Sequence, residues 1–451
     1  MAMGTRNPGQ IPMFLSPDEL PEAPTSPFFD KLNQLLDQMG FDAYVETLCR
    51  PFYAERMGRP SLAPGVYFRL LLLGYLLGID SERGIALTVA DSLGLRRFLG
   101  YELQQSPPEH STISRSRRRI SLETHEEVFA WVLQRLREAG LAQGQTVAVD
   151  ATMLFASAAL RSLRRKDSKA GYREFVQGLA AAAGVATPTL AELAEFDRKR
   201  KDKTLSNKEW ESPTDPDARV AKMKDGTTHL AHKAEHAVDL ESGALLGVTL
   251  QAADQGDTAS LGKTLEAVQA AQGQGPEQVV ADKGYHSDAV LQDLDEAGQE
   301  AHIAEPQRGK RNFQGKPDAE RVVQGNRERV ASAAGKRLQK LRTEKVERSM
   351  AHMYTTGGMR RLHLRGRANI RKRLLVHACG FNLGVLMRAL TGIGTPRTLQ
   401  GQGGELAANH AEIAELPLQS AWSGLLDAIR GLLGPQPGEW TRIRLGSPVG
   451  C

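Results

Sequence analysis

Two valine-rich runs that each lead into an aspartate limit the fold of this chain more than any other feature. The run QTVAVDATML, residues 145–154, alternates and is rich in β-branched residues, which predicts a strand carrying Asp150 near its end. The run PEQVVADKGY, residues 276–285, predicts a further strand that ends at Asp282. Because a strand that looks buried gains nothing from a terminal carboxylate, each acid needs a turn or a ligand to explain it.

The elements expected around these strands predict a mixed sheet with helices. Residues 229–254 contain two alternating runs joined by a short polar turn, which indicates a β-hairpin. A right-handed crossover returns the chain parallel to its start, so the ends of the two acid-bearing strands should be neighbours. We therefore expect Asp150 and Asp282 to lie side by side. Further elements are expected as helices at about 258–272 and 287–298 and a short strand at 300–305.

The remaining chain divides into helical and irregular segments. Residues 28–139 show apolar side chains at helical spacing, which indicates an all-helical N-terminal domain. The second domain is expected at 140–390, with an insertion at about 160–228 where the pattern breaks. The other expected segments are a flexible lead at 1–27, a basic glycine-containing loop from Arg308 to about Ser332, helices at 336–354 and 371–390, and a C-terminal tail at 391–451.

Cysteine usage and hydropathy indicate a cytoplasmic protein that does not cross a membrane. Three widely spaced cysteines suggest neither a disulfide framework nor a cysteine-based zinc site. The most apolar run, Val66–Ile79, contains Arg69 and falls short of the roughly 20 residues that a membrane span needs, so a buried helix is expected. The N-terminus lacks the apolar core and small-residue cleavage site of a secretory signal.

Basic charge is concentrated in one part of the chain. Residues 301–373 contain 20 Lys or Arg against 6 Asp or Glu, an excess of 14 positive charges in a chain whose net charge is +5. Such a segment attracts a phosphate backbone, which favours nucleic acid as a partner. The alternative is a solvated helix face beside a basic loop.

A second basic segment lies in the helical region. The run SPPEHSTISRSRRRIS, residues 106–121, places Ser111 or Thr112 as the cap of a helix. That helix bears Arg115, Arg117, Arg118 and Arg119. This arrangement resembles the entry to a DNA-contacting helix. The alternative is an ordinary exposed helix face, because clustered arginines are more often simply on the surface.

A third acid is expected from the long helix at 336–354. At 100° per residue its apolar stripe includes Val346 and Tyr354, Glu347 borders the stripe, and Glu344 lies farther toward solvent. Two strand-terminal acids and further oxygen ligands suit Mg²⁺ or Mn²⁺, with Glu347 as the better third ligand. Each acid also has a simpler interpretation, as a turn cap for the aspartates and as a surface glutamate for Glu347.

The segments around these three acids carry a family resemblance. AVDATM at Asp150, ADKGYHS at Asp282 and KVERSMAHMYTTGGMRRLHLRG at Glu347, with HACGFNLG downstream, resemble the DDE-type transposases of bacterial insertion sequences over residues 28–390. The resemblance implies an α/β fold, a ribonuclease-H-like mixed sheet flanked by helices, after an all-α N-terminal DNA-binding domain. It also implies catalysis by two Mg²⁺ or Mn²⁺ ions and, as partners, transposon terminal inverted repeats, target DNA and a second copy of the chain as a homodimer on DNA.

One departure from the family pattern concerns the residues around the glutamate. Related transposases commonly have Tyr, Arg and Lys at offsets of −7, −4 and +7, where this chain has Lys340, Thr343 and Tyr354. The candidate replacements for these DNA contacts are Arg342, Lys345 and Arg348, and the candidates to orient the scissile phosphate are Lys283 and His286. Two other functions stay open, a nuclease that cuts without joining and a DNA-binding repressor derived from a transposase.

Overall fold

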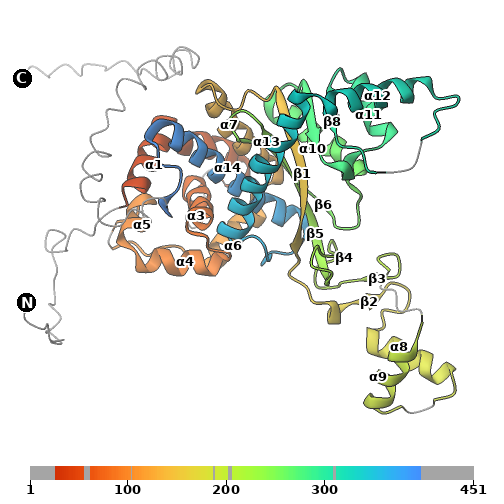
Figure 1. The fold of residues 1–451 in the computed structure, drawn as a ribbon. Helices are drawn as coiled ribbons and strands as arrows, with labels where there is room; N and C mark the ends of the chain where they lie inside the picture. The colour runs from red at the N-terminus through yellow and green to blue at the C-terminus, as the bar shows by residue number, and fades with distance from the viewer. Residues whose placement is uncertain are drawn as a thin grey trace, which may run out of the picture.

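The computed structural model describes residues 26–54, 61–102, 104–185, 188–201, 206–307 and 311–397. The flexible lead expected at 1–27, except its last two residues, and the expected tail beyond Arg397 lie outside the described residues. Figure 1 shows a block of helices beside a sheet, with an arm that carries α8 and α9 away from the sheet.

The N-terminal region is helical, and no strand precedes β1 within the described residues. The apolar run expected to be a buried helix is α3, which is buried on nearly all sides because it is apolar on nearly all sides. Its charged residue, Arg69, is only 4% exposed and forms ion pairs of 2.8 Å with both Asp37 and Asp42. The helices are α1 (Pro27–Gln38), α2 (Phe41–Cys49), η2 (Arg50–Phe52), α3 (Pro64–Leu77), α4 (Glu82–Asp91), α5 (Leu93–Phe98), α6 (His110–Arg119) and α7 (Leu122–Glu138).

The last described helix, α14 (Arg367–Thr391), joins the helical region to the sheet. It packs on α3 and α7 on one side and on β6 on the other, so one hydrophobic core contains residues of both parts. Among the described residues α14 is the one helix long and apolar enough to cross a membrane, but 72% of its apolar window is buried in the fold. Its charged groups are also used internally, since Lys372 donates to the carbonyl oxygens of Arg117 and Ile120 at 3.0 and 2.7 Å.

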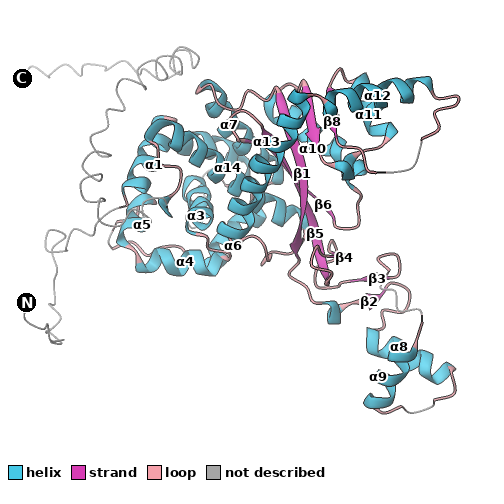
Figure 2. Cartoon of the chain, in the orientation of Figure 1, coloured by secondary structure: helices cyan, strands magenta, loops and turns pink. Residues whose placement is uncertain are grey.

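The sheet is mixed, as expected from the order of elements. Its strand order is β4-β5-β1-β7-β8, and β6 pairs with β5 beside β4. β5 runs antiparallel to β1, β4 and β6, whereas β1, β7 and β8 are parallel (Figure 2). The strands are β1 (Thr146–Phe155), β4 (Arg219–Lys222), β5 (Thr228–Asp239), β6 (Leu245–Ala252), β7 (Gln278–Ala281) and β8 (Glu300–Ile303).

Helices cover both faces of the sheet. α10 (Asp257–Gln272) packs on β5 and β6, and α13 (Ala333–Met350) packs on β1, β5 and β7 from the other face. Consecutive residues of β5 point to opposite faces of the sheet. Glu235 contacts α10 on one face, whereas His236 contacts α13 on the other. α11 (Asp288–Glu296) and α12 (Pro317–Ala331) lie beside β8, and a π-helical turn, η5 (Ala351–Thr356), follows α13.

The prediction of a loop from Arg308 to about Ser332 is wrong for most of this segment, because helix α12 occupies residues 317–331. Pro317 stands in the first turn, where its missing N–H costs nothing, and Asp318 and Glu320 add negative charge at the helix N-terminus. Gly325 stays inside the helix. The basic and glycine content that suggested a loop therefore belongs to a helix.

The segment expected as an insertion at about 160–228 forms the arm but also ends in the main sheet. β4, at 219–222, pairs with β5, so the last part of this segment is not an insertion. The arm has its own small apolar clusters, around Trp210 and around Val176 and Leu193. Its elements are η3 (Leu160–Ser162), β2 (Arg164–Arg165), α8 (Tyr172–Ala182), α9 (Leu190–Lys199) and β3 (Trp210–Glu211).

Lowering the pH below about 6.5 is expected to destabilise the helical region through His125. This fully buried side chain has Nδ1 2.6 Å from the Ser121 carbonyl oxygen and Nε2 3.0 Å from the Tyr67 hydroxyl. Burial lowers the pKa of His125 from 6.5 to about 3, so below pH 6.5 the unfolded chain takes up a proton that the folded chain refuses. Each pH unit in this window costs about 1.4 kcal/mol.

The measurement is the melting temperature of wild type and His125→Gln between pH 7.5 and 5. The variant is expected to lose less stability on acidification than wild type. His110→Gln, which changes an exposed histidine, is the control and should follow wild type. An identical pH response in all three proteins would remove His125 as a source of acid sensitivity.

Candidate active site

The structure places Asp150 and Asp282 side by side on neighbouring parallel strands. The last paired residues of β1 and β7 are Val149 and Ala281, and each acid follows directly. β1 itself continues past Asp150 because β5 pairs with it as far as Phe155. Burial, and to a lesser extent the charge of Asp282, raises the pKa of Asp150, although the Ala151 N–H and Arg342 act in the opposite direction. The two carboxylates therefore lie close enough to repel each other.

Each carboxylate is held by a local contact. Asp150 accepts from the Ala151 N–H through Oδ1 and from Arg342 Nη1 through Oδ2, both at 2.8 Å. Asp282 caps the 3-10 helix η4 (Lys283–Tyr285), since its Oδ1 accepts from the Gly284 N–H at 2.7 Å. One carboxylate oxygen of Asp282 therefore does cap a turn, as in the simpler interpretation. This does not exclude a role in the site, because Asp282 also lies beside Asp150.

The helix α13 brings Arg342, rather than a third acid, to Asp150. Glu347 and Glu344 are both exposed, whereas Val346 is buried as expected. The described part of the chain contains no group of three or more His, Cys, Asp or Glu residues arranged to hold a metal ion. Glu347 therefore stays a prediction as the third ligand.

Two contacts of His236 hold the end of α13 and the turn after it on the sheet. His236 on β5, which pairs with Asp150 of β1, lies 2.8 Å through Nδ1 from Ser349 Oγ. Its Nε2 lies 2.5 Å from the Tyr354 hydroxyl in the π-helical turn η5. Burial lowers the pKa of His236 to about 3, so the ring is neutral and can accept one hydrogen bond. Glu347 thus lies two residues before a buried anchor.

The acid pair fits a divalent cation in its donor chemistry. Carboxylate oxygens are the ligands that Mg²⁺ and Mn²⁺ take, and two of them on adjacent strands need a positive charge between or beside them. The guanidinium of Arg342, only 13% exposed, already supplies such a charge at Asp150. The donor atoms of Asp150 and Asp282 are thus of the kind that a divalent cation takes, and their binding of an ion stays a prediction.

The basic helix expected at 106–121 is α6, but its arginines differ in exposure. Arg115 and Arg118 are exposed, and Arg115 bonds back to Ser111. Arg117 is only 6% exposed, and it contacts Glu82 at 2.7 Å and Asn369 at 2.7 Å. The prediction of a DNA contact from Arg117 is wrong, because its guanidinium joins α6 to α4 and α14.

The prediction that Ser111 or Thr112 caps this helix is also wrong. α6 begins at His110 with Glu109 as the N-cap residue, and no side chain caps it. Ser111 and Thr112 lie within the first turn instead. Both residues are good caps in isolation, but the helix begins before either of them.

Of the other predicted contacts, the exposed side chains are Lys283 and Arg348, and Lys345 is half-buried against Gly243. His286 is 4% exposed, and its Nε2 has no hydrogen-bond partner among the described residues. Burial lowers the pKa of His286. The role of His286 in orienting the scissile phosphate stays a prediction.

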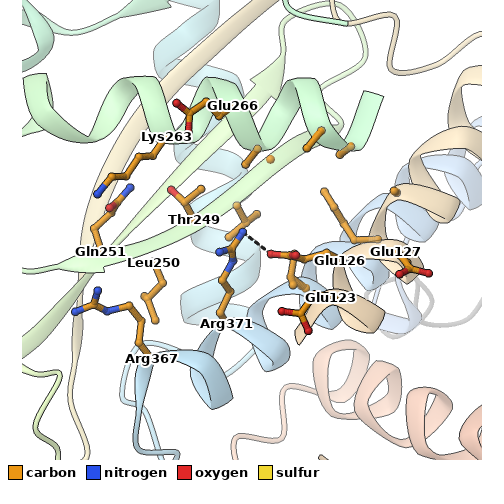
Figure 3. A pocket seen from close by; sticks show the side chains of 18 residues that line it. Glu123, Glu126, Glu127, Thr249, Leu250, Gln251, Lys263, Glu266, Arg367 and Arg371 are labelled. Carbon is orange, nitrogen blue, oxygen red and sulfur yellow. Dashed lines mark ion pairs between the residues drawn. The ribbon is translucent and has the colours of Figure 1, made fainter. Parts of the chain in front are cut away.

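A cavity of about 740 Å³ lies away from the acids, between the helical region and the edge strand β6 (Figure 3). Acidic side chains of α7 face basic side chains of α10 and α14 across it, and Arg371 forms a 2.6 Å ion pair with Glu126. None of the predicted site residues is among those lining it. The cavity is thus a gap between packed elements, lined by both charged and apolar side chains, rather than part of the acidic site.

Two stretches of the chain match known families. Residues 18–119 match the family described as Transposase domain (DUF772), and residues 197–383 match the family described as Transposase DDE domain. The second stretch contains Asp282 and Glu347, whereas Asp150 lies between the two matches and is placed by strand pairing. A comparison with curated proteins found no match.

Proposed function

Since the chain belongs to the DDE-type transposases of insertion sequences, we propose that it cuts DNA at transposon ends and joins the freed 3′ ends to target DNA. The observation that carries this proposal is the position of Asp150 and Asp282, each directly after the last paired residues of two neighbouring parallel strands. Two carboxylates held together by strand pairing suit a metal-assisted phosphoryl transfer. The exposed basic residues of the same domain suit a DNA backbone.

In this proposal Asp150 and Asp282 hold Mg²⁺ or Mn²⁺, and Glu347 is the third acid. Two such ions, when bound, supply an activated attacking oxygen and a stabilised leaving oxygen. Arg342 orients one oxygen of Asp150, and the Gly284 N–H orients one oxygen of Asp282. These contacts fix both carboxylates before DNA arrives, which reduces the reorganisation needed for reaction.

The partner in this proposal is double-stranded DNA, both the terminal inverted repeats and the target. Exposed basic side chains on α13 can meet phosphates near the acids, namely Lys336, Arg337, Lys340 and Arg348, with Lys283 on η4 and half-buried Lys345 beside them. A transposon has two ends, so two copies of the chain on DNA would give each end its own acid pair. The homodimer and a cytoplasmic location are part of the proposal.

The test is incubation of the full chain with labelled terminal-repeat DNA, a target plasmid and Mg²⁺. Cleaved ends joined to the plasmid are the expected product. Cleavage without joining would instead indicate a nuclease, and DNA binding without cleavage would indicate a repressor. Omitting the divalent cation should stop the reaction while DNA binding persists.

Replacing Arg115 and Arg118 together with alanine is expected to weaken binding to terminal-repeat DNA more than binding to scrambled DNA. Both guanidiniums are exposed on α6, where they can reach base edges as well as phosphates. Removing an arginine that hydrogen-bonds to a base should cost about 1 to 3 kcal/mol on the cognate sequence. The measurement is the Kd for both DNAs at one fixed salt concentration.

The control is the double variant Arg50→Ala and Arg97→Ala, which removes the same charge from exposed positions of the same helical region. It should lower both affinities slightly and equally. Equal losses on both DNAs for the Arg115 and Arg118 variant would make these residues phosphate contacts only. No loss on either DNA would leave α6 as an ordinary exposed helix.

A further inference from the structure

A buried ion pair lies on the α10 face of the sheet. Lys233 and Glu235, two residues apart on β5, point to the same face and are 1% and 0% exposed. Lys233 Nζ lies 3.1 Å from Glu235 Oε1. Replacing a buried ion pair with apolar residues is often neutral or stabilising, so stability alone does not account for this pair.

Glu235 is held by hydroxyl groups from two elements. Thr264 Oγ1 of α10 donates to Oε2 at 2.6 Å, and the Tyr285 hydroxyl donates to Oε1 at 3.1 Å. Ser260 also donates to Oε1, and it accepts from Lys233 at 2.9 Å. These contacts satisfy a buried carboxylate whose desolvation would otherwise be costly. They also connect β5 to the residue that ends η4.

Tyr285 ties this buried pair to the second acid of the site. η4 is three residues long, and Asp282 caps its start through the Gly284 N–H. Tyr285, fully buried, ends the same turn and bonds to Glu235. The turn that orients the Asp282 carboxylate is thus fixed at one end by its own cap and at the other by Glu235.

Lys233 is also connected to the η4 turn, through Asp257. Its Nζ lies 2.5 Å from Oδ1 of Asp257, the first residue of α10. A Cβ atom at position 284 would come within 3.0 Å of Asp282 Oδ1 and closer still to Asp257 Oδ2. The carboxylates of Asp257 and Asp282 thus both pack against this turn, and a side chain at 284 would have to displace them.

We propose that Lys233, Glu235 and Tyr285 are positioning residues that hold Asp282 in the orientation that binds a divalent ion. This inference rests on the proposed function, in which Asp282 is a metal ligand. The three residues act through the η4 turn and do not touch the ion or DNA. Residues that orient metal ligands typically change metal affinity or activity by 10- to 100-fold when they are replaced.

The test compares Tyr285→Phe with Tyr67→Phe in the full chain. Both variants remove one buried phenol hydroxyl, which bonds to Glu235 at 3.1 Å in one case and to His125 at 3.0 Å in the other. Tyr67 lies in the helical region, away from the acids. Mn²⁺ affinity is measured by titration calorimetry without DNA, and cleavage is measured against Mn²⁺ concentration.

Tyr285→Phe is expected to weaken Mn²⁺ binding by about 10-fold or more and to shift the Mn²⁺ dependence of cleavage by the same factor. DNA affinity should not change. Tyr67→Phe should lower the melting temperature to a similar degree and leave Mn²⁺ affinity within about twofold of wild type. Equal Mn²⁺ affinities in the two variants would overturn the inference.

A second variant covers the case in which Tyr285→Phe does not fold. Gly284→Ala displaces the Asp257 carboxylate from an exposed turn and should weaken Mn²⁺ binding, whereas Gly262→Ala, with open space around its Cβ, should not. Wild-type Mn²⁺ affinity in Gly284→Ala would also overturn the inference. A wild-type protein that neither binds Mn²⁺ nor cuts end DNA would instead refute the proposed function itself.

Discussion

Replacing Asp150 or Asp282 with alanine is expected to lower strand cleavage by about 10³-fold or more, because in the proposed mechanism each change removes a metal ligand worth several kcal/mol in the transition state. DNA affinity should stay the same or rise slightly, since a negative charge is removed near the phosphates. The measurement is the rate of cleavage of labelled end DNA at saturating protein, with binding measured separately.

Measuring the melting temperature of each variant distinguishes a loss of catalysis from a loss of the folded protein. Removing Asp150 also leaves the guanidinium of Arg342 without its ion pair, so some loss of stability is expected, and cleavage is compared at a temperature well below the melting temperature of each variant. The control is Asp293→Ala, which removes an exposed carboxylate from α11 and should leave cleavage unchanged. Full cleavage by either acid variant would exclude the paired aspartates as the catalytic centre.

Glu347→Gln is expected to lower cleavage by a similar factor, about 10³-fold, while Glu344→Gln changes it by less than about threefold. Both glutamates are exposed, lie three residues apart on α13, and lose one charge on replacement, so each serves as the control for the other. Both variants should melt at the wild-type temperature because neither side chain is buried. The reverse result, an inactive Glu344→Gln and an active Glu347→Gln, would move the third acid to Glu344.

The sequence predicted those parts of the fold that depend on local pattern. Strands β1 and β7 were recognised because valines lead into each acid, and parallel pairing through a right-handed crossover then placed Asp150 beside Asp282. Helix α12 was missed because its basic residues and Gly325 resemble a loop, and its partners on α11 and β8 are not visible in its own sequence. Local pattern therefore predicted elements and strand ends, but not every helix.

Contacts between distant residues could not be predicted in this way. The ion pair between Arg342 and Asp150 joins residues that are 192 positions apart in the sequence. The hydrogen bond between Arg117 and Asn369 joins residues that are 252 positions apart. The Lys233 and Glu235 pair did leave a signal, since two opposite charges lie two residues apart, and thus on one face, in a strand with few turn residues. Charges on the buried face of a strand indicate a polar network, but they do not show which residue that network positions.

The packing of α14 on α3 affects how the chain is made. α3 ends at Leu77 and α14 begins at Arg367, so about 290 residues must follow α3 before its apolar surface finds this partner. At 5 to 20 residues per second, synthesis of that interval takes about 15 to 60 s. During that time α3 is a target for chaperones and proteases, and a chain that stops before α14 keeps that exposure permanently. Premature termination should thus remove the protein by degradation rather than leave a stable fragment that competes for transposon ends.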